Sequence, residues 1–307
     1  MNLQIRAARL AMRALQHGSP TLAAALAERL FFTPPRTRLG PQVAAFLRTG
    51  RPLRVRVREG RIAAWSWGEG GGPVVVLAHG WGGRGARLAA AYVEPLVAQG
   101  FSVVTFDAPG HGASDGWLSS MPQFARALQA VADAAGSVFA IAAHSMGGSA
   151  SALAMSQGLQ VDRAVFLAPA ADPARFAADF ASTLAVGPVA MAAMRDRSER
   201  RLAFRWADLD VPRMARAFDV PLLVIHDRDD ATVPWTDGAA IAAAWPGAEL
   251  VTTTGLGHRD VVRDSGVVDR VVAFIREGRE QAVADEGGWL ERDLFRREGR
   301  RRRIFAH

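Results

Sequence analysis

Six short strand-like segments, separated by stretches long enough for a helix, constrain the fold of this chain more than any other feature. Most of them are apolar runs, typical of strands that helices cover on both faces. They lie at residues 74–78, 102–106, 138–143, 164–168, 222–225 and 249–253. This alternation of strands and helices predicts an α/β fold with a doubly wound, mostly parallel sheet.

Two further segments, 53–58 and 62–67, predict a β-hairpin ahead of that core. Val55 and Val57 alternate with arginines, as in a half-buried strand, and Glu59 and Gly60 supply the turn. Residues 1–50 predict an N-terminal helical segment. The main domain would then span residues 51–280, and residues 281–307 would form an arginine-rich tail.

Residues 169–219 interrupt the alternation. They are helix-rich, show no clear strand pattern, and are far longer than a usual connection between strand and helix. We expect a helical cap over the carboxyl ends of the strands, where ligands bind in such sheets. Some of its apolar side chains should line a pocket beneath it. The candidates are Phe176, Phe180, Leu184, Met191, Met194 and Trp206.

The chain contains neither cysteine nor lysine, which narrows the chemistry available to it. Disulfides, thiolate zinc sites, cysteine nucleophiles, Schiff-base lysines and phosphate-binding Walker lysines are all excluded. Covalent catalysis would depend mainly on Ser, Thr, Asp or Glu, with histidine as the base. None of the histidines has the spacing of a metal site, so we expect no bound metal.

Residues 138–149 combine a buried strand, a turn of small residues around Ser145, and the start of a helix. This layout is that of a nucleophile elbow, which lifts the serine Oγ clear of the sheet. Backbone N–H groups at the start of the helix would stabilise a developing oxyanion. The literal Gly-x-Ser-x-Gly pattern lies instead around Ser114. Because Ser114 follows a loop rich in Pro and Gly and precedes no immediate helix, we prefer Ser145, although Ala143 replaces the first glycine.

A nucleophilic serine needs a base, and the base needs an acid that orients it. Loops at the predicted carboxyl edge of the sheet supply Ser145, Asp230 and His258, in that order along the chain. The acid has neighbours at Asp227 and Asp229. Asp172, after the preceding strand, is a reserve candidate for the acid.

This order and five motifs resemble the α/β-hydrolase superfamily, in its serine esterase/lipase-like branch. The motifs lie at residues 79–83, 107–114, 143–148, 230–234 and 257–258. The resemblance implies that Ser145 attacks a substrate carbonyl, His258 takes the serine proton and Asp230 orients the imidazole. The family's pattern places the acid just before x-x-Val-Pro, which favours Asp230. The backbone N–H groups of Trp81 and Met146 would form the oxyanion hole.

A serine at the elbow favours acyl transfer to water, whereas dehalogenase-like and epoxide-hydrolase-like members of the superfamily use aspartate there. The resemblance therefore implies a cofactor-free serine hydrolase of small-molecule carboxylic esters or thioesters. Three alternatives stay open. They are a C–C bond hydrolase with the same triad, an acyltransferase, and a non-catalytic binding protein on the same scaffold.

The formal net charge is +7, and arginine is concentrated at residues 292–303. We expect a solvated tail without specific nucleic-acid recognition, because aromatic residues are sparse there. A weak peripheral membrane contact through this tail or the N-terminal helix, whose arginines 6, 9 and 13 share one face, is the alternative. The sequence shows no convincing secretory signal or membrane-spanning run, so we expect a cytoplasmic location.

Overall fold

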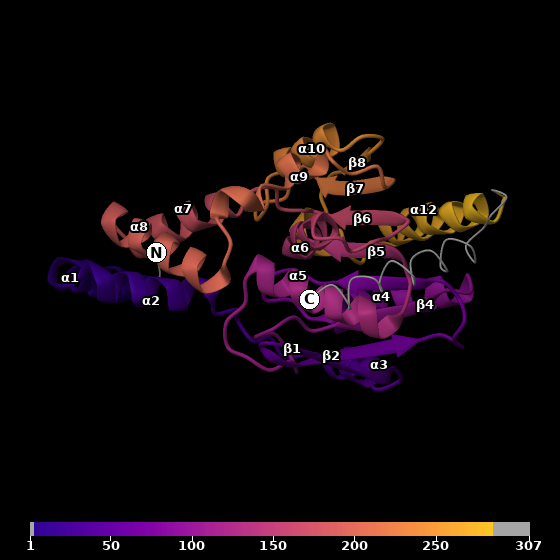
Figure 1. The fold of residues 1–307 in the computed structure, drawn as a ribbon, viewed down its shortest axis with the longest axis horizontal. Helices are drawn as coiled ribbons and strands as arrows, with labels where there is room; N and C mark the ends of the chain where they lie inside the picture. Colours follow the sequence, from indigo (N-terminus) through magenta and orange to yellow (C-terminus); the bar gives the residue numbers. More distant parts are fainter. Residues whose placement is uncertain (1–2, 285–307) are drawn as a thin grey trace, which may run out of the picture.

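An eight-stranded sheet runs through the computed structural model, which describes residues 3–284 (Figure 1). The strands lie in the order β1-β2-β4-β3-β5-β6-β7-β8. The pairs β1–β2 and β2–β4 are antiparallel, and every other pair is parallel. This confirms the predicted doubly wound, mostly parallel sheet. The strands are β1 (Arg51–Val57), β2 (Gly60–Trp67), β3 (Val74–Ala78), β4 (Ser102–Phe106), β5 (Val138–His144), β6 (Arg163–Leu167), β7 (Leu222–Asp227) and β8 (Glu249–Thr253).

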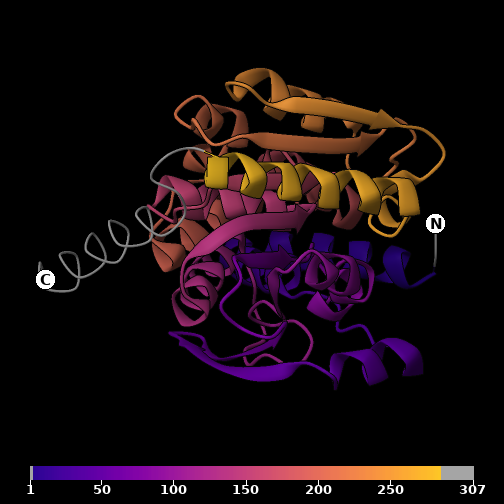
Figure 2. The same cartoon turned by 90° about the vertical axis from the view of Figure 1, so that its right-hand side faces the viewer.

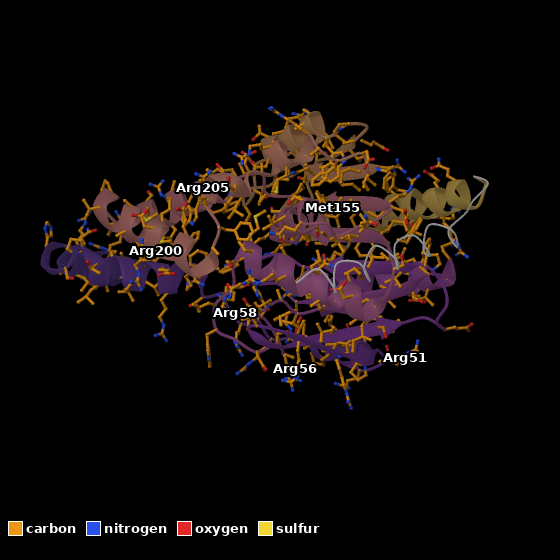
Figure 3. The ribbon with its side chains drawn as sticks, in the orientation of Figure 1. Arg51, Arg56, Arg58, Met155, Arg200 and Arg205 are labelled. Atoms are coloured by element: carbon orange, nitrogen blue, oxygen red, sulfur yellow. The ribbon has the colours of Figure 1, made fainter. Side chains whose placement is uncertain are left out.

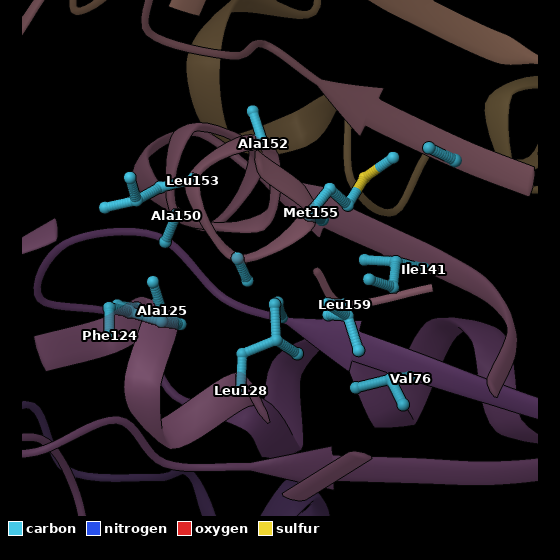
Figure 4. Close-up of a cluster of buried hydrophobic side chains, with 14 of the residues drawn as sticks. Val76, Phe124, Ala125, Leu128, Ile141, Ala150, Ala152, Leu153, Met155 and Leu159 are labelled. Carbon is cyan, nitrogen blue, oxygen red and sulfur yellow. The ribbon is translucent and has the colours of Figure 1, made fainter. Parts of the chain in front are cut away.

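Helices cover both faces of the sheet, which explains why the central strands are apolar along their whole length (Figure 2). Side chains alternate across a strand, so Val75 and Leu77 of β3 pack on one helical layer and Val76 on the other. Figure 4 shows part of the core on the face of the sheet that contains Val76, where Leu128 of the covering helix lies with Val76 and Ile141. One layer contains α4 (Gly85–Ala98) and α12 (Ser265–Ala284), and the other α5 (Met121–Ala135), α6 (Met146–Ser156), α9 (Val211–Ala215) and α10 (Trp235–Ala244).

Two elements near the ends of the main domain differ from what the sequence pattern indicates. A final helix is expected from about residue 261, but the structure has a short α11 (Gly257–Asp260) and starts α12 at Ser265. Asp264 sets that start, because its Oδ1 accepts the backbone N–H of Val267 at 3.1 Å. Helix α3 (Pro41–Leu47) lies within the segment 1–50 that is expected to be helical, but no local pattern indicates its bounds. It begins with proline in its first turn and packs on α4.

The helical insertion at residues 169–219 lies beside the N-terminal helices, which pack against it (Figure 1). Ala23, Ala24 and Ala27 of α2 lie in one buried cluster with Ala190 and Met194 of α8. Small side chains on α2 allow the two helices to approach closely. The elements are α1 (Leu3–Gly18), α2 (Pro20–Phe32), α7 (Pro173–Leu184), α8 (Pro188–Leu202) and the 3-10 helix η1 (Trp206–Leu209).

Polar contacts also fasten the N-terminal helices to the insertion. The carboxylate of Glu28 on α2, which is buried, accepts hydrogen bonds from Arg197 Nε at 3.1 Å and Arg201 Nε at 2.7 Å. A buried carboxylate needs such partners because it has lost its water. Gln16 of α1 donates to the carbonyl of Ala185 and accepts from the N–H of Gly187. We call α1, α2, α7 and α8 the four-helix cap.

Within residues 3–284, no helix combines the length and the apolar character needed to cross a membrane. The predicted arginine-rich tail lies outside the described residues from position 285 onward.

Candidate active site

Ser145 occupies the turn between β5 and α6 in a backbone conformation that few residues other than glycine adopt. Its φ is 54° and its ψ is −125°, and such strain persists only where the surroundings fix it. The Ser145 N–H donates to the carbonyl of Leu167 at 2.9 Å, and its carbonyl accepts from Gly148 N–H at 2.9 Å. Gly80 leaves room for the side chain, because a Cβ there would lie 2.8 Å from Ser145 Cβ. The Ser145 hydroxyl makes no hydrogen bond with any residue between 3 and 284.

His258 and Asp230 meet at the same edge of the sheet. His258 lies in the short α11 that follows β8, and Asp230 in the loop that follows β7. His258 Nδ1–H donates to Asp230 Oδ2 at 2.7 Å. The other carboxylate oxygen accepts the backbone N–H groups of Thr232 and Val233, both at 2.8 Å. The Asp230 side chain is fully buried and that of His258 is 12% exposed. The imidazole is therefore fixed through Nδ1, which leaves Nε2 to act on a bound molecule.

The charge state of Asp230 follows from these contacts. Burial opposes ionisation, but hydrogen bonds from His226, His258 and the N–H of Val233 outweigh it and hold the pKa of Asp230 below its usual range. The carboxylate is therefore ionised, and it can stabilise a positive charge that develops on His258.

The other candidate acids bond to backbone and side chains away from His258. Asp227 accepts from Thr253 Oγ1 at 2.7 Å, and Asp229 accepts from the N–H of Gly255 at 2.8 Å. Asp172 caps the start of α7. Of the four aspartates considered from the sequence, the structure brings only Asp230 to the histidine.

Ser114, the serine in the literal motif, lies in a different environment. Its Oγ accepts the N–H of Ala63 at 2.9 Å and donates to the carbonyl of Asp107. The residue is buried, and these bonds tie its loop to β2. The structure brings no histidine to its hydroxyl within the described chain.

Two buried histidines hold the loop that carries Trp81. His79 Nε2 accepts the N–H of Ala108 at 3.0 Å, and His111 Nε2 accepts the N–H of Gly82 at 3.0 Å. Accepting requires a neutral ring. Burial lowers the pKa of both residues, to about 3 for His111, which keeps the rings neutral near pH 7.

The two expected oxyanion donors are both available. The N–H of Met146 begins α6, where helix geometry gives it no partner. The N–H of Trp81 makes no hydrogen bond within residues 3–284. Gly147 allows α6 to approach the end of β3, because a Cβ there would lie 2.6 Å from the carbonyl oxygens of Ala78 and His79.

A cavity of about 1100 Å³ connects these groups and is roofed by the cap. Ser145, His258, Trp81 and Met146 all line it. Phe31 of α2 reaches into the roof, where its ring lies 5.2 Å from that of Phe180 and 5.9 Å from that of Trp206. Helix α2 thus supplies part of the cavity wall, and this aromatic wall suits an apolar ligand.

Comparisons with known proteins agree with this geometry. An α/β-hydrolase family model described as "Serine aminopeptidase, S33" matches residues 72–206. A second, described as "TAP-like protein", matches residues 206–286. The chain belongs to the α/β-hydrolase superfamily. The two matches together run from β3 through the insertion to α12.

Curated relatives match over shorter stretches. A human "Serine hydrolase-like protein" is 33% identical over 101 residues, which cover 31% of this chain and 49% of the relative. A "Putative carbamate hydrolase RutD" of Stutzerimonas stutzeri is 34% identical over 114 residues, covering 36% of this chain and 41% of the relative. This α/β hydrolase therefore spans less than half the length of these curated relatives.

Solved structures show the same fold at low identity. The carboxylesterase CesB (YbfK) from Bacillus subtilis has a TM-score of 0.57 and 17% identity, covering 83% of this chain and 98% of its own. An esterase from Exiguobacterium antarcticum has a TM-score of 0.56 and 14% identity, covering 74% and 100%.

His144 and His226 both contact the candidate triad of this α/β hydrolase. His144 Nε2–H donates to the carbonyl of His258 at 2.9 Å, and burial lowers the pKa of His144 to about 3. His226, fully buried, places Nε2 3.0 Å from the carbonyl of Val233 and 3.4 Å from Asp230 Oδ2. The sequence could have indicated these contacts only through position, since His144 precedes Ser145 directly and His226 lies four residues before Asp230. Within residues 3–284 no cluster of three or more His, Asp or Glu could hold a metal ion.

Proposed function

We propose that this chain is a serine hydrolase that cleaves small-molecule carboxylic esters or thioesters through an acyl-enzyme on Ser145. One observation carries the proposal. Ser145, on its strained turn, lines the same cavity as His258, whose ring is fixed by the buried and ionised Asp230. A serine, a histidine and an orienting carboxylate in that relation form the machinery of acyl transfer.

In the proposed reaction, Ser145 Oγ attacks the substrate carbonyl while His258 Nε2 takes its proton. Asp230 stabilises the resulting imidazolium. The N–H groups of Trp81 and Met146 stabilise the oxyanion, and losing one such donor typically costs about 10²–10³ in rate. The imidazolium then protonates the leaving alcohol or thiol. Water, deprotonated by the same histidine, releases the acid and restores the serine.

The cavity supports a substrate with an apolar acyl or alcohol portion, because aromatic side chains of the cap form its roof. The esterases among the solved structures support the esterase/lipase-like branch. One matching model is described as a serine aminopeptidase and one relative as a putative carbamate hydrolase, so amides and carbamates belong among the compounds tested.

The decisive experiment compares the wild type, Ser145→Ala and Ser114→Ala on chromogenic esters of increasing acyl length, with an anilide and a carbamate alongside. A fluorophosphonate probe should label the wild type and Ser114→Ala but not Ser145→Ala. Ester turnover in Ser145→Ala should fall by a factor of about 10³ or more. Full activity in Ser145→Ala would refute the assignment of the nucleophile.

The same purified protein separates the alternatives left open by the sequence. Cleavage of a diketone without cleavage of simple esters would indicate a C–C bond hydrolase. Product esters formed with added alcohol would indicate an acyltransferase. A wild type that the probe does not label would indicate a binding protein. The cytoplasmic location is part of the proposal, and cell fractionation tests it.

A further inference from the structure

Helices α1 and α2 of the four-helix cap expose four large apolar side chains, all of them leucines. The exposed fractions are 66% for Leu10, 61% for Leu22, 40% for Leu26 and 46% for Leu30. The last three follow one another at four-residue intervals, so they lie along one side of α2. The opposite side of α2 is already used, because it packs on α8. We call these four residues the leucine face.

Along α1 and α2 the leucine face is accompanied by arginine, and neither helix carries an exposed acidic residue. Residues 1–50 contain seven arginines and one acidic residue, Glu28, which is buried and paired with α8. Arg6, Arg13 and Arg29 are exposed, and no described residue forms an ion pair with them. Helical spacing places Arg6 and Arg13 beside Leu10, and Arg29 beside Leu26.

The leucine face also reaches the cavity. Leu30 belongs to the face and lines the same cavity as Ser145, next to Phe31. An apolar surface that continues into an apolar cavity suits a lipid-like ligand. Such a ligand can pass from a bilayer into the cavity without exposing its hydrocarbon chain to water.

We infer that α1 and α2 dock this protein on a bilayer surface that contains anionic lipids. The leucines would enter the boundary between headgroups and acyl chains, and the arginines would bind lipid phosphates. A second copy of the chain is a poor occupant, because it would bring two arginine-rich faces together without acidic partners. A nucleic acid would bind the arginines but gain nothing from four exposed leucines. The inference does not depend on the proposed function.

The experiment is co-sedimentation of the full chain with vesicles of phosphatidylglycerol and phosphatidylcholine, and with vesicles of phosphatidylcholine alone. The wild type should bind the first and bind the second far more weakly. Leu22→Gln/Leu26→Gln should lower the partition coefficient at least about tenfold, since two apolar side chains no longer enter the interface. Arg6→Gln/Arg13→Gln should lower it about 25-fold, at about fivefold for each arginine, and added salt should weaken wild-type binding.

Two matched variants keep the test specific. Arg54→Gln/Arg56→Gln removes the same charge from the exposed side of β1, away from α1 and α2 (Figure 3 labels Arg56), and should bind like the wild type. Leu22→Phe/Leu26→Phe keeps the apolar character and should also bind. Thermal unfolding verifies that each variant is folded.

Several results would overturn the inference. They are no vesicle binding by the wild type, equal binding to both kinds of vesicle, and unchanged binding by the leucine variant. A wild-type dimer that Leu22→Gln/Leu26→Gln converts to a monomer in size-exclusion chromatography would instead assign the leucine face to self-association. Binding to a DNA duplex that competes with vesicles and survives the leucine changes would assign it to nucleic acid.

Discussion

Replacing Gly147 by alanine should separate folding from catalysis, because this glycine lies where α6 crosses the end of β3. An added Cβ would lie 2.6 Å from the carbonyl oxygens of Ala78 and His79, whereas ordinary contact starts at 3.4 Å. Both oxygens belong to the backbone, so no side-chain rotation relieves the clash. Either α6 or the end of β3 must move by about 0.8 Å.

The size of the effect follows from what that movement displaces. Overpacking of this kind costs about 1–3 kcal/mol of unfolding free energy, and the higher helix propensity of alanine returns at most about 1 kcal/mol. The variant should therefore fold. The end of β3 continues directly into the loop that carries the Trp81 N–H, and α6 carries the Met146 N–H. A misplacement near 1 Å can cost about 10²-fold in rate, so kcat/KM should fall about 100-fold.

The assay is kcat/KM on the best chromogenic ester, with the midpoint of urea unfolding measured alongside. Gly148→Ala is the matched control, because its Cβ would meet only side-chain atoms of Phe166 and Pro169 at 3.3 Å. That variant should stay within about threefold of wild-type kcat/KM. Wild-type activity in Gly147→Ala, or an equal loss in both variants, would refute the argument from the crossing.

Three further predictions concern the acid, the literal-motif serine and the buried histidines. Asp230→Asn should lower kcat by about 10⁴, whereas Asp229→Asn should stay near wild type; more than a tenth of wild-type activity in Asp230→Asn would contradict the assigned acid. Ser114→Ala should lose about 1–3 kcal/mol of unfolding free energy but keep its kcat, and loss of turnover in a folded variant would contradict its structural role. His111 and His144 have pKa values near 3 when folded and an ordinary value of 6.5. The unfolded chain therefore binds more protons in that interval, and unfolding free energy should fall by about 1.4 kcal/mol per pH unit for each histidine as the pH drops below 6.5. His111→Gln should reduce this slope in urea titrations, and an unchanged slope would contradict the neutral buried ring.

The strands were predictable because a strand that is buried on both faces has a continuous apolar sequence. Residues 74–78 and 138–143 are apolar throughout, and the helices between strands have lengths that fit the crossovers. The start of α12 was misplaced because residues 261 and 262 are apolar, and the apolar pattern outweighed the single capping side chain of Asp264. The short α3 depends on contacts with α4, which no local pattern reveals.

Part of the candidate site could be predicted from the sequence, but from motifs rather than from apolar patterns. Motif order names Ser145, Asp230 and His258, and strand ends place them at one edge. The contacts of His144 and His226 were missed because sequence gives a residue's type but not the direction of its ring. The association of α2 with α8 was also unreadable, since Glu28 and Arg201 lie 173 positions apart.

The position of Phe31 in the cavity roof has a consequence for how this protein can diversify. Part of the cavity wall is formed by α2, within the first 32 residues and ahead of every strand of the sheet, and α2 is anchored mainly through α8. Substitutions, exchanges or extensions there can reshape the cavity while the strand ends that carry Ser145, Asp230 and His258 keep their sequence. In the proposed hydrolase, selectivity and chemistry would therefore depend on separable parts of the chain, and changes in α1 and α2 alone would be enough to alter specificity.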